Sequence, residues 1–208
     1  MARDVDQANG PGSATRERIL SAALDLVAER GLQSLTHRGV EERAGVSHGL
    51  TTYHFTNRDA LIEALFTYTL ERQLEWVTQL QDELAAARTV SPTVDPVRYV
   101  ERAVATLVTE RSLTLARYEM FLHAARTPHL QATAREIRQP FVAIFAEAFT
   151  AAAPDPLWAA HRLLSAVEGM LLFQISGPET EFDAWAAEYV VTIAQALSGA
   201  PSGPPANG

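Results

Sequence analysis

The sequence predicts an all-α protein in which a small N-terminal helical domain precedes a larger helical one. Apolar residues recur at helical spacing through most of the chain, beginning with Ile19, Ala22, Ala23 and Leu26. No stretch alternates between apolar and polar residues for long enough to predict a β-strand. Breaks rich in glycine and proline divide the chain into pieces of ordinary helix length. We therefore expect about nine helices, three of them in the small first domain.

The first part of the chain contains one helix of moderate length, two short ones and the start of a long one. Residues 15–30 form the first helix, with Thr15 able to cap its start and Gly31 able to end it. A short helix begins at Thr36 and breaks at residues 44–46, which read Ala-Gly-Val. Another short helix runs to residue 54, and we expect Ser47 to cap it. Residues 57–88 then form a long amphipathic helix that leaves the first domain.

The second part of the chain is divided by prolines. After the loop TVSPTVDP we expect helices at 95–110 and 112–125, and a further helix that starts at Thr127-Pro128. Pro140 lies in the middle of that helix and is expected to bend or divide it. Two strongly apolar helices, 157–176 and 180–198, end the ordered part. Residues 1–12 and 199–208 are rich in polar and small residues and are expected to be disordered tails.

Charge is distributed unevenly along the 208 residues. The formal net charge of −8 argues against a protein that coats nucleic acid indiscriminately, because phosphate neutralisation needs clustered positive charge. Residues 13–66 hold six arginines and seven carboxylates, whereas residues 67–208 hold ten arginines and sixteen carboxylates. The N-terminal third is therefore the part that repels a polyanion least.

Composition disfavours several other kinds of protein. The chain has no cysteine, so disulfides and thiolate metal sites are excluded. There is no HExxH pattern, glycine-rich phosphate loop or Gly-x-Ser-x-Gly sequence, so we expect neither an enzyme nor a bound cofactor or metal. The N-terminus is polar and no stretch supplies about 18 uninterrupted apolar residues, so we expect a cytoplasmic protein without membrane contact.

Residues 36–61 predict a helix-turn-helix. The segment reads as a helix, a tight turn that contains Gly45, a second helix and the capped start of the long helix. The second helix presents hydroxyl, imidazole and phenol groups, which match phosphate oxygens and base edges in a major groove. Gly49 would let its backbone approach DNA closely.

The same segment resembles the N-terminal signature of the TetR family of transcriptional regulators. The residues that carry the resemblance are Val40, Ala44-Gly45-Val46-Ser47, Gly49, His54-Phe55 and Asp59, within a match of about residues 14–66. The sequence departs from the signature at Glu41, where a small residue is usual, at Thr52 and Tyr53, where the tyrosine is displaced by one position, and at Arg58, which replaces a lysine.

The resemblance implies which residues contact DNA and which function each part of the chain has. It implies phosphate or base-edge contacts by Thr36, Arg38, Tyr53, His54 and Arg58, and base contacts by His48, Leu50 and Thr51; Ser47, Gly49 and Thr52 complete the expected surface. An alternative for Arg38 is a plain surface charge, and Phe55 is expected in the core. The resemblance further implies that residues 13–66 bind DNA and residues 67–198 bind an effector and dimerise.

An effector pocket is expected in the second domain, for an unknown small apolar molecule. The residues at helical spacings that could converge on it are Leu107, Arg111, Tyr118, Phe121, Leu122, Phe141, Met170 and Phe173. The alternative is that most of them are ordinary core residues.

A homodimer is expected because the last two helices carry too many apolar residues for the outside of a monomer. Leu163, Val167, Leu171, Val190, Ile193 and Leu197 would meet their counterparts in a four-helix bundle. Such a dimer would hold two reading helices about 34 Å apart, on a near-palindromic operator in double-stranded DNA. The sequence thus favours an effector-released repressor, and a helical adaptor that works through protein contacts is the alternative.

Overall fold

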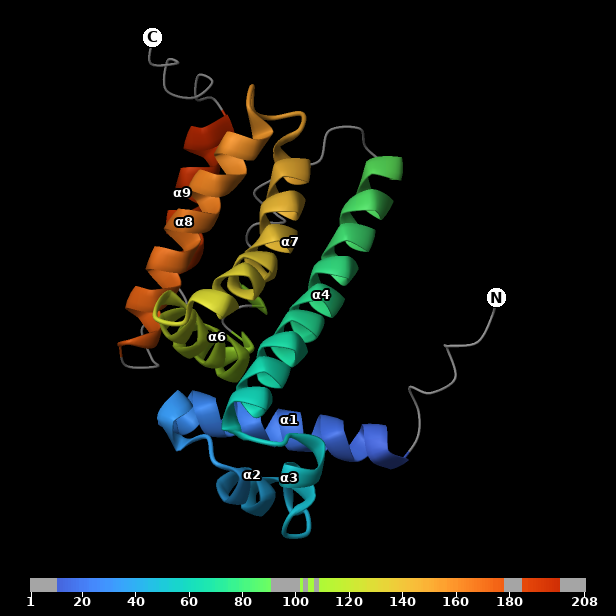
Figure 1. Cartoon of the computed structure of the whole chain (residues 1–208). Coiled ribbons are helices and arrows are strands. Elements are labelled where there is room, and N and C mark those ends of the chain that lie inside the picture. Colours follow the sequence, from blue (N-terminus) through green and yellow to red (C-terminus); the bar gives the residue numbers. More distant parts are fainter. Residues whose placement is uncertain (1–10, 91–101, 103–104, 107–108, 178–184, 199–208) are drawn as a thin grey trace. The chain divides into compact units, whose positions relative to one another are not determined.

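The computed structural model of the chain describes residues 11–90, 102, 105–106, 109–177 and 185–198 (Figure 1). Every regular element in this part is helical, which confirms the predicted all-α architecture. The α-helices bounded there are α1 (Pro11–Arg30), α2 (His37–Ala44), α3 (Leu50–His54), α4 (Arg58–Val90), α6 (Arg111–Ala125), α7 (Gln131–Phe149), α8 (Pro156–Ile175) and α9 (Trp185–Ser198). Two 3-10 helices, η1 (Leu32–Ser34) and η2 (Pro128–Leu130), accompany them. The expected C-terminal tail, residues 1–10, Leu107 and most of the expected helix 95–110 lie outside the described residues.

Helix α1 starts four residues earlier than its sequence predicts. It begins at Pro11, so Thr15 lies inside the helix and does not cap it. Proline suits the first turn because its missing N–H has no partner there in any helix. Gly31 ends the helix as expected, and its backbone N–H donates to the carbonyl of Val27 at 2.8 Å.

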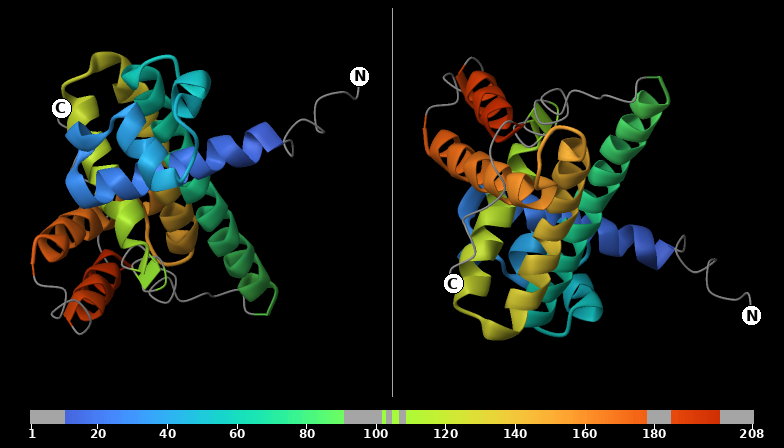
Figure 2. Two further views of the ribbon diagram at one scale, coloured as in Figure 1. Left: turned by 90° about the horizontal axis from the view of Figure 1, so that it is seen from below. Right: turned by 90° about the horizontal axis from the view of Figure 1, so that it is seen from above.

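The first compact unit comprises the chain up to Glu71 together with Arg111–Ala134. Within it, α1 packs against α2 on one side and against α6 on the other (Figures 1 and 2). Each fully buried aliphatic or aromatic side chain contributes about 1.5–3 kcal/mol to such a core. Phe55 is buried as predicted, and the other large core side chains include Val27, Leu35, Val40, Leu61, Leu65, Phe66 and Met120.

The second compact unit comprises Arg72–Glu110 and the chain from Arg135 onward. The phenyl rings of α7 form much of its core, and the ring of Phe141 lies 5.4 Å from that of Trp76, centroid to centroid. Asp155 caps α8 by accepting the N–H of Trp158 at 3.0 Å, with Pro156 in the first turn. Helices α8 and α9 lie side by side (Figure 2). Helix α7 continues through Pro140 as one element, so the proline does not divide it.

The residues that we expected at a dimer interface are mostly internal to one chain. Leu163, Val167, Leu171, Val190 and Leu197 are buried, and Ile193 is half-buried. A side chain already buried within one chain has no surface to offer a second copy, so these buried residues are the wrong ones. The large apolar side chains that α8 exposes are instead Leu157, Leu172 and Phe173, and α9 exposes Tyr189.

None of the described helices is both long and apolar enough to cross a membrane. The described residues also contain no group of three or more histidine, aspartate or glutamate side chains placed to hold a metal ion.

Candidate nucleic-acid interface

The reading head, defined here as residues 36–58, consists of α2, the turn, α3 and the first residue of α4. Thr36 caps α2 as predicted, since its Oγ1 accepts the N–H of Gly39 at 3.1 Å. Gly45 ends α2 with φ 62° and ψ 37°, a left-handed conformation that glycine adopts without strain. The predicted helix, glycine turn and second helix are therefore all present.

A buried carboxylate, rather than a serine, holds the start of α3. Glu41 is only 4% exposed, and its Oε1 accepts the backbone N–H groups of Gly49 at 2.9 Å and Thr51 at 3.1 Å. Its Oε2 lies 2.8 Å from Nδ1 of His48. Gly49 is the N-cap residue, with φ 87°, so the prediction that Ser47 caps this helix is wrong. Ser47 contributes only its backbone carbonyl, which accepts the N–H of Leu50.

The charge on Glu41 is stabilised despite its burial. Burial raises the pKa of this carboxyl, but hydrogen bonds from Thr51, His48 and Gly49 oppose it and hold the pKa below its ordinary value. Glu41 is therefore ionised at neutral pH and accepts every hydrogen bond it makes.

The side chains of α3 and of the turn before it divide between the surface and the core. His48, Thr52 and Tyr53 are exposed, Tyr53 by 81%, while Leu50 and His54 are half-buried. The side chain of Thr51 is fully buried, so the expectation that it reaches a base is wrong. Thr51 lies on the side of the helix that packs on α2, where its backbone N–H meets Glu41.

The two arginines expected to contact phosphates differ in what they bind within the chain. Arg58 donates from Nε to the carbonyl of Leu35 at 3.0 Å and from Nη2 to the carbonyl of Leu32 at 2.8 Å. Its guanidinium therefore ties the start of α4 to the segment before α2. Arg38 is exposed and pairs with Glu42 one turn later on α2, a contact that DNA phosphate could replace.

Three residues support the reading head without belonging to the expected contact set. Nε2 of His37 lies 2.9 Å from the carbonyl oxygen of Phe55, which joins the start of α2 to the end of α3. The guanidinium of Arg16 lies 5.5 Å from the centre of the Phe55 ring, so a positive charge from α1 stands beside α3. Glu41 was visible in the sequence only as a departure from the family signature.

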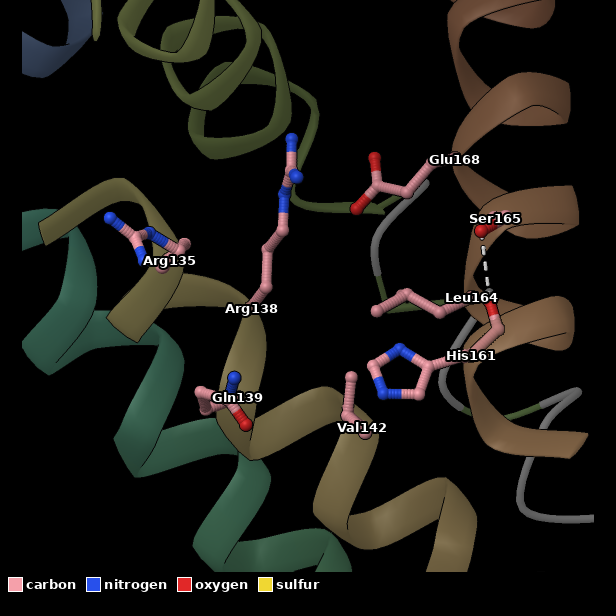
Figure 3. Close-up of a pocket in the computed structure, with 8 residues that line it drawn as sticks. All are labelled: Arg135, Arg138, Gln139, Val142, His161, Leu164, Ser165 and Glu168. Carbon is pink, nitrogen blue, oxygen red and sulfur yellow. Dashed lines mark hydrogen bonds between the residues drawn. The ribbon is translucent and has the colours of Figure 1, made fainter. Parts of the chain in front are cut away.

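A second candidate site is a cavity between α7 and α8 in the second unit (Figure 3). Its volume is about 360 Å³, at the small end of the range for ligand pockets. In Figure 3, Arg138 and Glu168 project from facing helices toward the same space, and the ring of His161 lies beside Val142. The lining residues are Arg135, Arg138, Gln139, Val142, His161, Leu164, Ser165 and Glu168.

The residues expected to line an effector pocket do not line this cavity. Phe141 and Met170 are buried core residues of the second unit, and Phe173 is 69% exposed on α8. Arg111, Tyr118, Phe121 and Leu122 lie on α6 in the first unit. There the rings of Tyr118 and Phe121 lie 5.2 Å and 5.7 Å from the guanidinium of the fully buried Arg117.

Two family models match the chain. One, for bacterial regulatory proteins of the tetR family, matches residues 19–65 and so includes the reading head. The other, for the tetracyclin repressor-like C-terminal domain, matches residues 91–199, which is more than half of the 208 residues.

Individual relatives agree with these models. The HTH-type transcriptional regulator UidR of Escherichia coli K12 is 31% identical over 70 residues, which cover 34% of this chain and 36% of UidR, so the chain matches about a third of that relative's length. The structure of a TetR family member from Streptomyces coelicolor A3 is 28% identical with a TM-score of 0.68, and the match covers 88% of this chain and 97% of that one. The multidrug binding protein EbrR, crystallised with ethidium, is 28% identical with a TM-score of 0.63 and coverages of 91% and 99%. The chain belongs to the TetR family, whose members are DNA-binding transcriptional regulators with ligand-binding domains.

Proposed function

We propose that this protein is a homodimeric repressor that binds a near-palindromic operator and releases it when a small molecule binds. Residues 13–66 would bind DNA, and residues 67–198 would bind the effector and dimerise. The observation that carries the proposal is the surface of α3 and of the turn before it, where His48, Thr52 and Tyr53 are exposed beside a buried support. Imidazole, hydroxyl and phenol groups on a short helix and the turn that leads into it suit contacts to base edges and phosphates.

The exposed face of α8 supports pairing between two copies. Leu172 and Phe173 are exposed by 54% and 69%, an unusual surface for two neighbouring large apolar residues. Gly169 is exposed one turn earlier on the same face, and a residue without a side chain lets a partner helix approach closely. If this face of one chain packs against the same face of a second chain, the two form a dimer with two-fold symmetry. A two-fold symmetric protein binds a near-palindromic DNA site.

The cavity between α7 and α8 supports a small-molecule effector. Two arginines, a histidine and Glu168 suit a polar group on the ligand, and Val142 and Leu164 suit an apolar part. We therefore propose an amphipathic effector in place of the wholly apolar one that the sequence favoured. EbrR, a structural relative, was crystallised with ethidium.

Helix α4 is the element through which an effector would act on DNA binding. Its first turns belong to the first compact unit and the rest to the second. Effector binding that favours a different position of α4 would change the separation of the two reading heads. The effector can weaken operator binding only by its difference in affinity for the two states.

The experiment that tests this proposal selects duplexes from a random DNA pool with the purified full chain. We expect a palindromic winner whose affinity falls with salt, because bound phosphates release counterions. The slope of log K against log salt then estimates the number of phosphates contacted. A selection that enriches no sequence at low salt would reject operator binding and favour the adaptor alternative.

A further inference from the structure

Glu41 and His48 form a pair in which only one partner is accessible to DNA. The side chain of Glu41 is 5% exposed and that of His48 is 77% exposed, and Glu41 Oε2 lies 2.8 Å from His48 Nδ1. Nδ1 therefore points inward to the carboxylate. Nε2, on the far side of the same ring, belongs to the exposed part of the imidazole.

The carboxylate determines which ring nitrogen carries the proton. Both oxygens of Glu41 accept hydrogen bonds, since Oε1 already accepts the N–H groups of Gly49 and Thr51. An ionised carboxylate has no proton to give, so Nδ1 must be the donor in the contact with Oε2. When the ring is neutral, Nε2 consequently has a free lone pair and is a hydrogen-bond acceptor.

We propose that Glu41 is a positioning residue that makes His48 a reader of exocyclic amino groups in the major groove. In that groove only cytosine N4 and adenine N6 present donors, whereas guanine and thymine present acceptors at the corresponding edge. An accepting Nε2 thus favours cytosine or adenine over guanine or thymine at one position of each half-site. This inference rests on the proposed operator binding and adds a base preference to it.

The substitution Glu41→Gln reverses the polarity of His48 without changing the shape of its support. The two backbone donors, Gly49 and Thr51, retain the amide oxygen at the place of Oε1. The amide nitrogen must then face His48 and donate to Nδ1, which moves the ring proton to Nε2. His48 becomes a donor toward DNA, so guanine gains affinity relative to cytosine at the same position.

The test is a selection from a random duplex pool at pH 8.5, above the range in which histidines usually titrate. It is followed by affinity measurements on the winning duplex with each base pair at each position. We expect one position per half-site at which the wild-type chain prefers an amino-bearing base by about three- to tenfold, the worth of one hydrogen bond. Glu41→Gln should shift the base preference at that position toward guanine, and His48→Ala should abolish the preference there.

The control is Glu42→Gln, which removes the same charge from a neighbouring exposed position on α2. It should change affinity for all sequences alike and leave every base preference in place. In the His48→Ala background, Glu41→Gln should no longer shift any preference.

The possible outcomes separate this inference from the proposed function. If the wild-type chain enriches no sequence, operator binding fails and the inference falls with it. If the wild-type chain selects a site but Glu41→Gln binds it with unchanged base preferences and merely weaker affinity, operator binding stands and Glu41 is a helix cap only. A preference that survives His48→Ala would likewise overturn the reading role of His48.

Discussion

Glu119 Oε2 on α6 accepts the backbone N–H of Leu32, at 3.0 Å across 87 positions of the sequence. The contact satisfies the first residue of η1, immediately after α1 ends, and so ties α6 to the segment that leads into the reading head. Helix α6 is thereby part of the same compact unit as α2 and α3, although it follows them by more than 50 residues.

Glu119→Ala is expected to destabilise the first unit. It leaves the Leu32 N–H without its acceptor, which costs about 1–3 kcal/mol in the free energy of unfolding. Urea denaturation measures the loss. Glu71→Ala, which removes an exposed carboxylate from α4 in the same unit, should change stability by less than about 0.5 kcal/mol. Equal losses in the two variants would contradict a specific role for Glu119.

Arg58→Ala is expected to lower stability, whereas Arg38→Ala is expected to leave stability unchanged. Arg58→Ala removes both donors to the Leu35 and Leu32 carbonyls and should lower the free energy of unfolding by about 1–3 kcal/mol. Arg38→Ala removes an exposed charge, so it should leave stability within about 0.5 kcal/mol of the wild type. If Arg38 contacts a phosphate, its loss reduces the slope of log K against log salt for operator binding by about one per reading head. An unchanged slope would make Arg38 a plain surface charge.

The family motif could be predicted from the sequence because it is local. Thr36 and Gly45 act through neighbours within a few residues, and each has its expected role. Glu41 could not be assigned, since its partners become visible only when the turn brings α3 back onto α2. Its presence in place of a small residue was the available signal.

The interface residues were mispredicted for a different physical reason. Apolar periodicity identifies the hydrophobic side of a helix but not what that side packs against. Leu163 and Val167 lie on the strongly apolar side of α8 and face the core of their own chain. Phe173 is off that stripe, and its exposure appears only once the helix is placed among its neighbours.

Phe173→Glu is therefore expected to dissociate the proposed dimer. A charge in a closely packed two-fold interface meets its own copy and loses water, which disfavours association. Sedimentation at micromolar concentration should show a monomer for this variant and a dimer for the wild type. Leu122→Glu, at an exposed leucine on α6, serves as the control and should sediment as the wild type does. A dimeric Phe173→Glu chain would place the interface elsewhere.

Stability should fall with acid through Glu41 and Glu29. The pKa of Glu29 is lowered chiefly by its hydrogen bond from Arg43, and that of Glu41 is lowered by three hydrogen bonds that oppose its burial. A carboxyl whose folded pKa lies below its ordinary value of 4.5 stabilises the fold above that value and loses this contribution as the pH falls through the folded pKa. Between pH 7 and pH 3 the melting temperature should therefore fall less for Glu41→Gln than for the wild type. If the melting temperatures of the two proteins fall equally with pH, Glu41 makes no pH-dependent contribution to stability.

Gln73 offers a test of what a buried amide without a hydrogen-bond partner costs the fold. It is 2% exposed on α4, and among the described residues neither its amide nitrogen nor its amide oxygen has a hydrogen-bond partner. A buried amide in that condition costs about 1–3 kcal/mol, so Gln73→Met, which keeps nearly the same volume, should raise the free energy of unfolding by about 1 kcal/mol. Gln79→Met makes the same replacement at an exposed position of the same helix and should be neutral.

The same variant distinguishes a packing defect from a binding group. Gln73 is not among the residues that line the cavity between α7 and α8, so Gln73→Met should release the operator at the same effector concentration as the wild type. Denaturation in urea and a titration of operator release, with compounds that release the wild type, measure the two effects on the same preparation. Greater stability with unchanged release would mean that Gln73 is a buried polar residue without a role in binding, and lower stability would mean that its amide is satisfied in solution.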